Sequence, residues 1–155
     1  MKTQNAGFSL MELMVVVAII GILSAFAYPS YVRYVDNAYR DDAKAALISL
    51  AAHLERRFTE NNSYCDSGNT EVTDCGAATG DSGAPAFFAT SVPLNGGTPI
   101  YNLVIEDVSP TSFEIRAVPV VGQRMANDNC GQFVYTNTGR KSLDPLVPPE
   151  PDDCW

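Results

Sequence analysis

The sequence has 155 residues, with 10 basic and 18 acidic side chains and a net charge of -8 when its single histidine is neutral. This acidic balance argues against a general attraction to nucleic-acid phosphates or to anionic lipids. The length allows an N-terminal apolar segment followed by one domain of ordinary size with a modest core, and it requires no second domain.

The dominant element is an apolar run near the N-terminus. From Leu13 to Val32 there is no Asp, Glu, Lys, Arg or His. About 20 helical residues rising ~1.5 Å each span roughly 30 Å, which is the thickness of a bilayer core. Glu12 stands at the start of this run, where a carboxylate facing lipid would cost at least ~2.5 kcal/mol. Glu12 therefore needs a partner or another reason for its position.

A short polar leader, residues 1–7, precedes the run and contains one lysine and no acidic residue. A cut after Gly7 would make Phe8 the new N-terminus, one helical turn from Glu12. The new α-ammonium group and the Glu12 carboxylate could then neutralise each other in an apolar environment. In a filament, the amine of a neighbouring subunit could equally be the partner.

The six residues from Gly7 to Glu12, Gly-Phe-Ser-Leu-Met-Glu, resemble the precursor motif of type IV pilins and pseudopilins. In that family the motif starts with a glycine, which is usually followed by a phenylalanine. A threonine or serine, a leucine, a hydrophobic residue and a glutamate come next, and an apolar helix follows. The resemblance implies that a prepilin peptidase cuts between Gly7 and Phe8, that Phe8 is N-methylated, and that subunits polymerise through the helix with Glu12 acting in assembly.

Two other interpretations of the apolar run stay open. Residues 25–27, Ala-Phe-Ala, offer a site for the ordinary signal peptidase, and an uncleaved membrane anchor would have a similar composition. The position of Glu12, the weak positive charge of the leader, and Pro29 two residues after the alternative cut argue against a secretory signal peptide.

The apolar helix has two weak points, Gly21 and Pro29. Pro29 removes one backbone hydrogen bond and is expected to kink or open the helix locally. The resemblance points to both residues as the place where the helix stretches during assembly, whereas helix packing in a membrane explains them equally well. Tyr28, Tyr31 and Tyr34 fit an interfacial aromatic belt or contacts between subunits.

Residues 30–60 contain no further glycine or proline and are predicted to continue as one helix. Apolar residues recur there at steps of three and four, which predicts a stripe that packs on downstream strands. His53 lies beside the stripe and has no second histidine with which to form a metal or catalytic pair. The stripe consists of Ala43, Ala46, Leu47, Leu50, Ala51, Leu54 and Phe58.

Residues 61–95 are rich in Gly, Asn and Ser and predict a long loop, which is our candidate for a surface that meets neighbours or ligands. Alternating apolar residues then predict strands at 100–108 and 112–121, joined by a turn at 109–111, and at 132–136 and 141–143. We expect an α+β fold in which this antiparallel sheet packs on the helix stripe.

Four cysteines in a chain that is expected to leave the cytoplasm predict two disulfides rather than a metal site, because there is no Cys-x-x-Cys and only one histidine. Of the three pairings, Cys65 with Cys75 and Cys130 with Cys154 would close two local loops. The C-terminal disulfide-bounded loop of similar subunits favours this pairing, which would dock Trp155 against the sheet edge. A Cys75–Cys130 bond would instead tie the long loop to the sheet.

The sequence lacks a Gly-x-Ser-x-Gly motif, a glycine-rich phosphate loop and a histidine pair for zinc. We therefore expect no enzymatic activity, no cofactor and no bound metal. At residues 127–129, Asn-Asp-Asn, a turn is a simpler explanation than a calcium site. The net charge disfavours nucleic-acid binding unless Arg116, Arg124, Arg140 and Lys141 gather on one face.

A looser resemblance to type IV minor pilins extends over residues 57–64, the hairpin at Tyr101, residues 128–131 and the Thr138-Gly139 turn. The chain departs from that pattern by extra cysteines in the loop and a proline-rich end. The resemblance implies a structural subunit of a type IV pilus, with roles in pilus assembly, adhesion, motility or DNA uptake. The alternatives are a major pilin, a DNA-binding uptake receptor and a pseudopilin of a type II secretion system.

The resemblance also implies the organisation and location of the chain. Residues 1–7 would be the leader, residues 8–35 the transmembrane and filament-core half of the helix, and residues 36–155 the head domain. We expect a single-pass protein of the bacterial inner membrane with a periplasmic head, which becomes part of an extracellular filament. Its expected partners are other pilin subunits, the prepilin peptidase and the inner-membrane assembly machinery.

Overall fold

A computed structural model of the chain describes residues 8–70, 75, 80–144 and 154–155. The chain divides into two compact units, Met1–Asn37 and Ala38–Trp155. Gly7, with the rest of the predicted leader, and residues 145–153 of the proline-rich end lie outside the described residues.

A single helix, α1 (Leu10–Asn61), supplies all the regular structure described in the first unit. It remains helical at Gly21 and Pro29, and the stretching of this segment during assembly stays a prediction. Among the described residues, α1 is the one helix long and apolar enough to cross a membrane, judged by length and composition.

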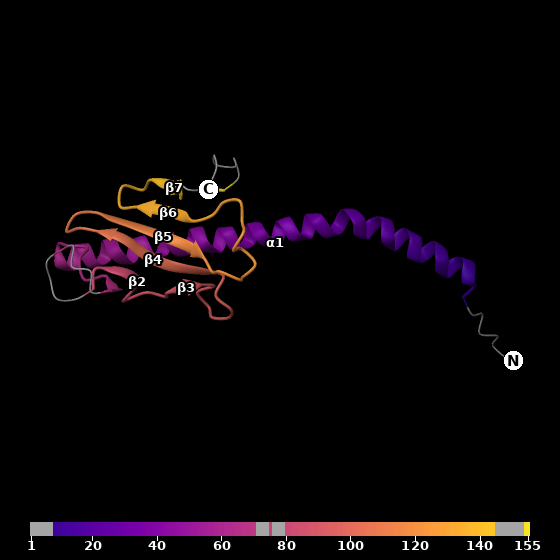
Figure 1. Cartoon of the computed structure of the whole chain (residues 1–155), viewed down its shortest axis with the longest axis horizontal. Helices are drawn as coiled ribbons and strands as arrows, with labels where there is room; N and C mark the ends of the chain where they lie inside the picture. The colour runs from indigo at the N-terminus through magenta and orange to yellow at the C-terminus, as the bar shows by residue number, and fades with distance from the viewer. Residues whose placement is uncertain (1–7, 71–74, 76–79, 145–153) are drawn as a thin grey trace. The chain divides into compact units, whose positions relative to one another are not determined.

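In the second unit, α1 presents the predicted apolar stripe to the core. Six of its seven residues are buried, and the seventh, Phe58, is partly buried and stacks on Tyr64 with ring centroids 4.6 Å apart. Figure 1 shows this half of α1 lying along one face of the sheet. The periodicity of three and four residues therefore predicted the packing face correctly.

The described strands form one antiparallel sheet (Figure 1) in the order β1-β2-β4-β5-β6-β7, with β3 paired to β4. The expected α+β fold, a helix packed on an antiparallel sheet, is confirmed. The strands are β1 (Gly68–Thr70), β2 (Ser82–Pro85), β3 (Ser91–Val92), β4 (Tyr101–Val108), β5 (Phe113–Pro119), β6 (Phe133–Thr136) and β7 (Lys141–Leu143).

The central hairpin of β4 and β5 fixes the core. Ile105 pairs with Ile115 and Leu103 pairs with Ala117, and all four side chains are buried. Because directly opposed residues on neighbouring strands point to the same face, this register directs one side of the hairpin toward α1. The alternation that predicted both strands is confirmed.

The prediction that residues 61–95 form only a loop is wrong, because β1, β2 and β3 lie there. These strands are two to four residues long and rich in Gly, Ser and Pro, so they show no period. Gly83 has a φ of 88°, and a Cβ added to it would overlap the Thr70 hydroxyl. These strands therefore form because β2 and β3 pair with β4 and β1 pairs with β2, and not because of local propensity.

Candidate functional site

The first unit presents an almost wholly apolar surface. Its helical window contributes no buried residue, and Leu10 and Phe26 are 80% and 76% exposed. An exposed apolar surface of this length is unfavourable in water and requires a bilayer or other apolar helices around it. Tyr28, Tyr31 and Tyr34, at the end of the apolar run, are also exposed, as an interfacial or intersubunit belt requires.

Glu12 belongs to a helix cap that the sequence analysis missed. The backbone N–H of Glu12 donates to Ser9 Oγ at 3.2 Å, and the N–H of Leu13 donates to the Ser9 carbonyl at 3.2 Å. Ser9 is therefore the N-cap of α1 and Glu12 occupies the third helical position, as in a Ser-x-x-Glu capping box. The Ser-x-x-Glu pattern is readable in the sequence. The hydrogen bond uses the backbone N–H of Glu12, so the Glu12 carboxylate is left available for another partner.

The four cysteines form the two disulfides that the sequence analysis favoured. Cys65 is bonded to Cys75, and Cys130 is bonded to Cys154. The C-terminal pair holds Trp155 against the sheet edge, where its Nε1–H donates to the carbonyl of Ser142 in β7 at 2.8 Å. The Trp155 ring also meets Phe133 edge-on at 5.5 Å, which buries part of an aromatic side chain that would otherwise face water.

The loop closed by Cys65 and Cys75 is organised around Asp81. The Asp81 carboxylate is fully buried and accepts the N–H of Asp66 at 2.8 Å and the N–H of Cys75 at 3.0 Å. A buried carboxylate is tolerable only when such donors surround it. Asp81 also lies beside both sulfur atoms, but a disulfide offers no thiolate, so these residues do not form a metal site.

Asp128, in the Asn-Asp-Asn sequence considered for calcium, is already paired. Arg40 of α1 contacts both carboxylate oxygens, with Nε 3.0 Å from Oδ2. The N–H of Asp128 donates to the Met125 carbonyl, which makes a turn. The arrangement fastens the loop before β6 to α1.

Two of the four candidate DNA-binding cations, Arg116 and Lys141, lie on different faces of the sheet. Directly opposed residues on neighbouring strands point to the same face of the sheet. Arg116 therefore shares a face with Val134 and Ser142, whereas Lys141 shares the opposite, buried face with Tyr135. Arg116 Nη2 is 2.8 Å from Glu114 and Nη1 is 3.9 Å from Glu106.

Burial disfavours the charged form of the Arg116 guanidinium and by itself would lower its pKa. The hydrogen bonds that the Arg116 guanidinium donates to Glu114, together with the charges of Glu106 and Glu114, outweigh burial and raise the pKa of the guanidinium. Arg116 therefore stays charged, but neighbouring carboxylates offset its positive field.

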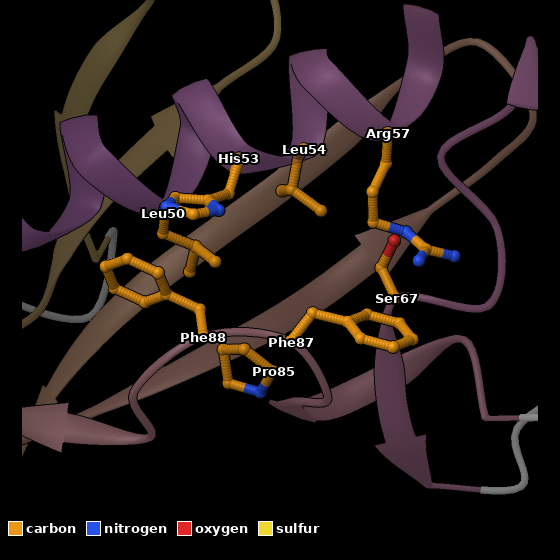
Figure 2. Close-up of a pocket in the computed structure, with 8 residues that line it drawn as sticks. All are labelled: Leu50, His53, Leu54, Arg57, Ser67, Pro85, Phe87 and Phe88. Carbon is orange, nitrogen blue, oxygen red and sulfur yellow. The ribbon is translucent and has the colours of Figure 1, made fainter. Parts of the chain in front are cut away.

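A shallow cleft opens beside the stripe of α1, as Figure 2 shows. Leu50 and Leu54 form its apolar floor. His53 packs on Phe88 with ring centroids 5.0 Å apart at one end. At the other end the Arg57 guanidinium lies 4.1 Å from the centre of the Phe87 ring. Ser67 and Pro85 complete the lining.

The enclosed volume of this cleft is about 10 Å³, which is close to the space of one water molecule. The cleft is therefore a groove for a protruding group and not a pocket for a whole small molecule. His53 was predicted to have no catalytic or metal-binding role, and here it serves as one wall of the groove.

Comparison with known proteins places these features in a family. Residues 29–134 match the family model described as type IV minor pilin ComP, DNA uptake sequence receptor. Residues 2–28 match the prokaryotic N-terminal methylation motif.

Curated relatives include the type IV major pilin protein PilA of Myxococcus xanthus, 41% identical over 43% of this chain and 30% of the relative. The type IV major fimbrial protein FimA of Dichelobacter nodosus is 38% identical over 66% of this chain and 59% of the relative. The chain thus spans about a third to three-fifths of the length of these two relatives.

Among solved structures, a type IV pilin from Shewanella oneidensis is 21% identical, with a TM-score of 0.44 over 77% of this chain and 96% of that one. The non-core minor pilin PilV of Neisseria meningitidis is 13% identical, with a TM-score of 0.43 over 75% of this chain and 95% of that one. Because the minor-pilin model matches 106 of 155 residues and the methylation motif precedes it, the chain belongs to the type IV minor pilin family.

Proposed function

We propose that this type IV pilus subunit is processed by cleavage between Gly7 and Phe8, N-methylated at Phe8, and held in the inner membrane by residues 8–35 with its head, residues 36–155, in the periplasm. The inner-membrane assembly machinery then moves it into an extracellular filament, where the helix joins the apolar core. The exposed apolar surface of α1, with Glu12 at its start, is the observation that supports this function most strongly.

Within this proposal, Glu12 neutralises an N-terminal amine in the filament core. The partner is the Phe8 amine of the same chain or of a neighbouring subunit. An ammonium group buried without a partner costs several kcal/mol, so pairing favours the correctly placed subunit over a misplaced one. Gly21 and Pro29 are the positions where we propose that α1 stretches to fit its neighbours.

The experiment replaces Glu12 with valine and measures leader removal, membrane insertion and incorporation into sheared filaments. We expect cleavage and insertion to persist and incorporation to fall at least tenfold, because a loss of several kcal/mol exceeds the ~1.4 kcal/mol of one decade. Ser9→Ala is the matched control, since it removes the helix cap and keeps the carboxylate. Normal incorporation of Glu12→Val, or an equal defect in Ser9→Ala, would contradict the charge role.

DNA binding is a second candidate function, because the description of the matching family model names a DNA uptake sequence receptor. The net charge of -8, the paired Arg116 and the separation of Arg116 from Lys141 oppose it. We expect weak binding that declines steeply with salt. Submicromolar, sequence-selective binding by the full chain in detergent at physiological salt would instead establish the receptor function.

We propose no catalytic role, since the family consists of structural subunits and the sequence has no catalytic motif. Roles in adhesion or motility would belong to the assembled filament and would not involve a reaction catalysed by this chain.

A further inference from the structure

The cleft of Figure 2 combines three properties that suit one type of ligand. Its floor is aliphatic, its two ends carry aromatic rings, and a guanidinium lies over one of these rings. Phe87 is 61% exposed, so a large aromatic surface faces outward beside a cation. Grooves of this kind bind extended proline-rich segments, whose rings stack on aromatic side chains at little cost in conformational entropy.

The walls of the cleft are held in place by local hydrogen bonds. Ser67 Oγ donates to the carbonyl of Tyr64 at 2.6 Å, and the N–H of Ala86 donates to the carbonyl of Ser67 at 2.9 Å. Arg57 Nη2 donates to the carbonyl of Asp66 at 3.2 Å. Within the described part of the chain, the buried Nε of Arg57 meets no hydrogen-bond acceptor. The groove is therefore preorganised by these hydrogen bonds.

The chain itself contains a segment of complementary chemistry. Residues 145–153, Pro-Leu-Val-Pro-Pro-Glu-Pro-Asp-Asp, include four prolines, two overlapping Pro-x-x-Pro steps, three carboxylates and no basic residue. Proline supplies rings for the aromatic walls, and the carboxylates match the charge of Arg57 and of Arg56 next to it.

The segment of the same chain is barely long enough to approach the cleft. It is anchored at Asp144, next to β7, and at Cys154, so an excursion out and back extends at most about 17 Å. The strand order places four interstrand spacings between β7 and β2, or roughly 19 Å, and the cleft lies beside β2. A bound segment of the same chain would have to be fully extended, so we take a second copy as the donor.

We propose that the cleft lined by His53, Arg57, Phe87 and Phe88 is a docking site for the acidic proline-rich segment, residues 145–153, of a second copy of the chain. The donor segment and the acceptor cleft are different surfaces of the chain, so the contact is heterologous and joins copies head to tail. This contact adds to the proposed pilus function, and peptide binding to the cleft does not depend on filament assembly.

The first test measures binding of a fluorescent peptide with the sequence of residues 145–153 to the full chain in detergent, by anisotropy. We expect saturable binding that weakens about tenfold in Phe87→Ala, the effect of losing one aromatic contact of roughly 1 to 1.5 kcal/mol. Val121→Ala is the matched control, because Val121 is 93% exposed and lies outside the cleft. Binding without saturation at millimolar peptide, or equal binding by Phe87→Ala, would overturn the proposal.

Peptide variants test the two parts of the recognition separately. Replacing Pro148 and Pro151 by alanine should weaken binding by removing ring stacking, and converting the three carboxylates to amides should weaken it and reduce its salt dependence. If neither change affects affinity, the peptide is not recognised by this chemistry and the assignment of the occupant is wrong.

The second test identifies the partner directly. A photocrosslinking phenylalanine at position 87 is mixed with an isotope-labelled second copy, and crosslinked peptides are mapped. Crosslinks to residues 145–153 of the labelled copy are expected. Crosslinks only within one chain, or only to another protein, contradict this docking site. Filament incorporation of Glu12→Val, measured separately, tests the proposed function without involving the cleft.

Discussion

At the scale of single residues, Glu12 serves two purposes, one through its backbone and one through its side chain. At Glu12 the backbone N–H completes the cap made by Ser9, while the carboxylate remains available for assembly. The sequence predicted the second role from the cost of placing a charge in an apolar run, but the cap was missed although Ser-x-x-Glu is readable in the sequence. Glu12→Val separates the roles, because it keeps the backbone bond and removes the charge.

Tyr64 provides a prediction of pH dependence. Its hydroxyl donates to Glu55 Oε1 at 2.9 Å, and burial together with Glu55 raises the pKa of Tyr64 to about 12, from 10.0 in the unfolded chain. The folded chain thus holds this proton more tightly. The resulting stability is fully present below the unfolded pKa of 10.0 and is lost as the pH rises to about 12.

Two pKa units correspond to roughly 2 to 3 kcal/mol. We expect the melting temperature of the full chain in detergent to fall steeply over this alkaline range, and Tyr64→Phe to flatten that part of the curve. An unchanged alkaline slope in Tyr64→Phe would assign the loss of stability to other groups.

Residues of the cleft could not have been predicted from the sequence. His53 and Arg57 come from α1, whereas Phe87 and Phe88 follow β2. They meet only because β2 pairs with β4, through the single register pair of Gly83 with Ile105. No local pattern in the sequence encodes that pairing.

At the level of elements, the segments with the strongest hydrophobic periodicity in the sequence were the ones predicted correctly. The α1 stripe repeats over four turns and β4 and β5 alternate over seven or eight residues, so both were correctly predicted. The strands β1, β2 and β3 have no such repeat and depend on tertiary pairing. Their glycines and prolines made the segment resemble a loop, although Gly83 is required there by its positive φ and close packing.

The C-terminal disulfide is the element whose loss we expect to matter most. Replacing Cys130 and Cys154 with serine opens a ring with a sequence separation of 24 and releases Trp155 from Phe133. The chain-entropy estimate is roughly 3 to 4 kcal/mol, so the melting temperature should fall and the tail should become protease-sensitive.

The control replaces both Cys65 and Cys75 with serine. These two cysteines have a sequence separation of only 10 residues. This control should affect global stability less, because the ring is smaller and Asp81 still binds the backbone of this loop. Equal or greater destabilisation by this control would contradict the ranking. Peptide mapping without reduction tests the pairing itself, and a Cys75–Cys130 crosslink would refute it.

At the level of the whole molecule, the two units have different solvent requirements. The first unit exposes large apolar side chains along the described part of its helix, while the second contains the helix stripe, the sheet and both disulfides. The apolar run and the polar remainder of the sequence predicted this division.

A head domain that begins at about residue 36 should fold alone, since it keeps the buried stripe and every described strand. We expect it to be a monomer at micromolar concentration with a cooperative thermal transition, and not to form filaments. An unfolded product by circular dichroism, or polymerisation without the apolar half of α1, would show that the division into an assembly helix and an independent head is wrong.

The central claim is that this chain enters a filament through a processed N-terminal helix. Mass spectrometry of the chain recovered from sheared, washed filaments tests it most directly. The account predicts an N-terminal peptide that begins at Phe8 and carries one methyl group on its amine. A chain that begins at Met1 or Tyr28, or that is present in membranes and absent from filaments, would contradict it.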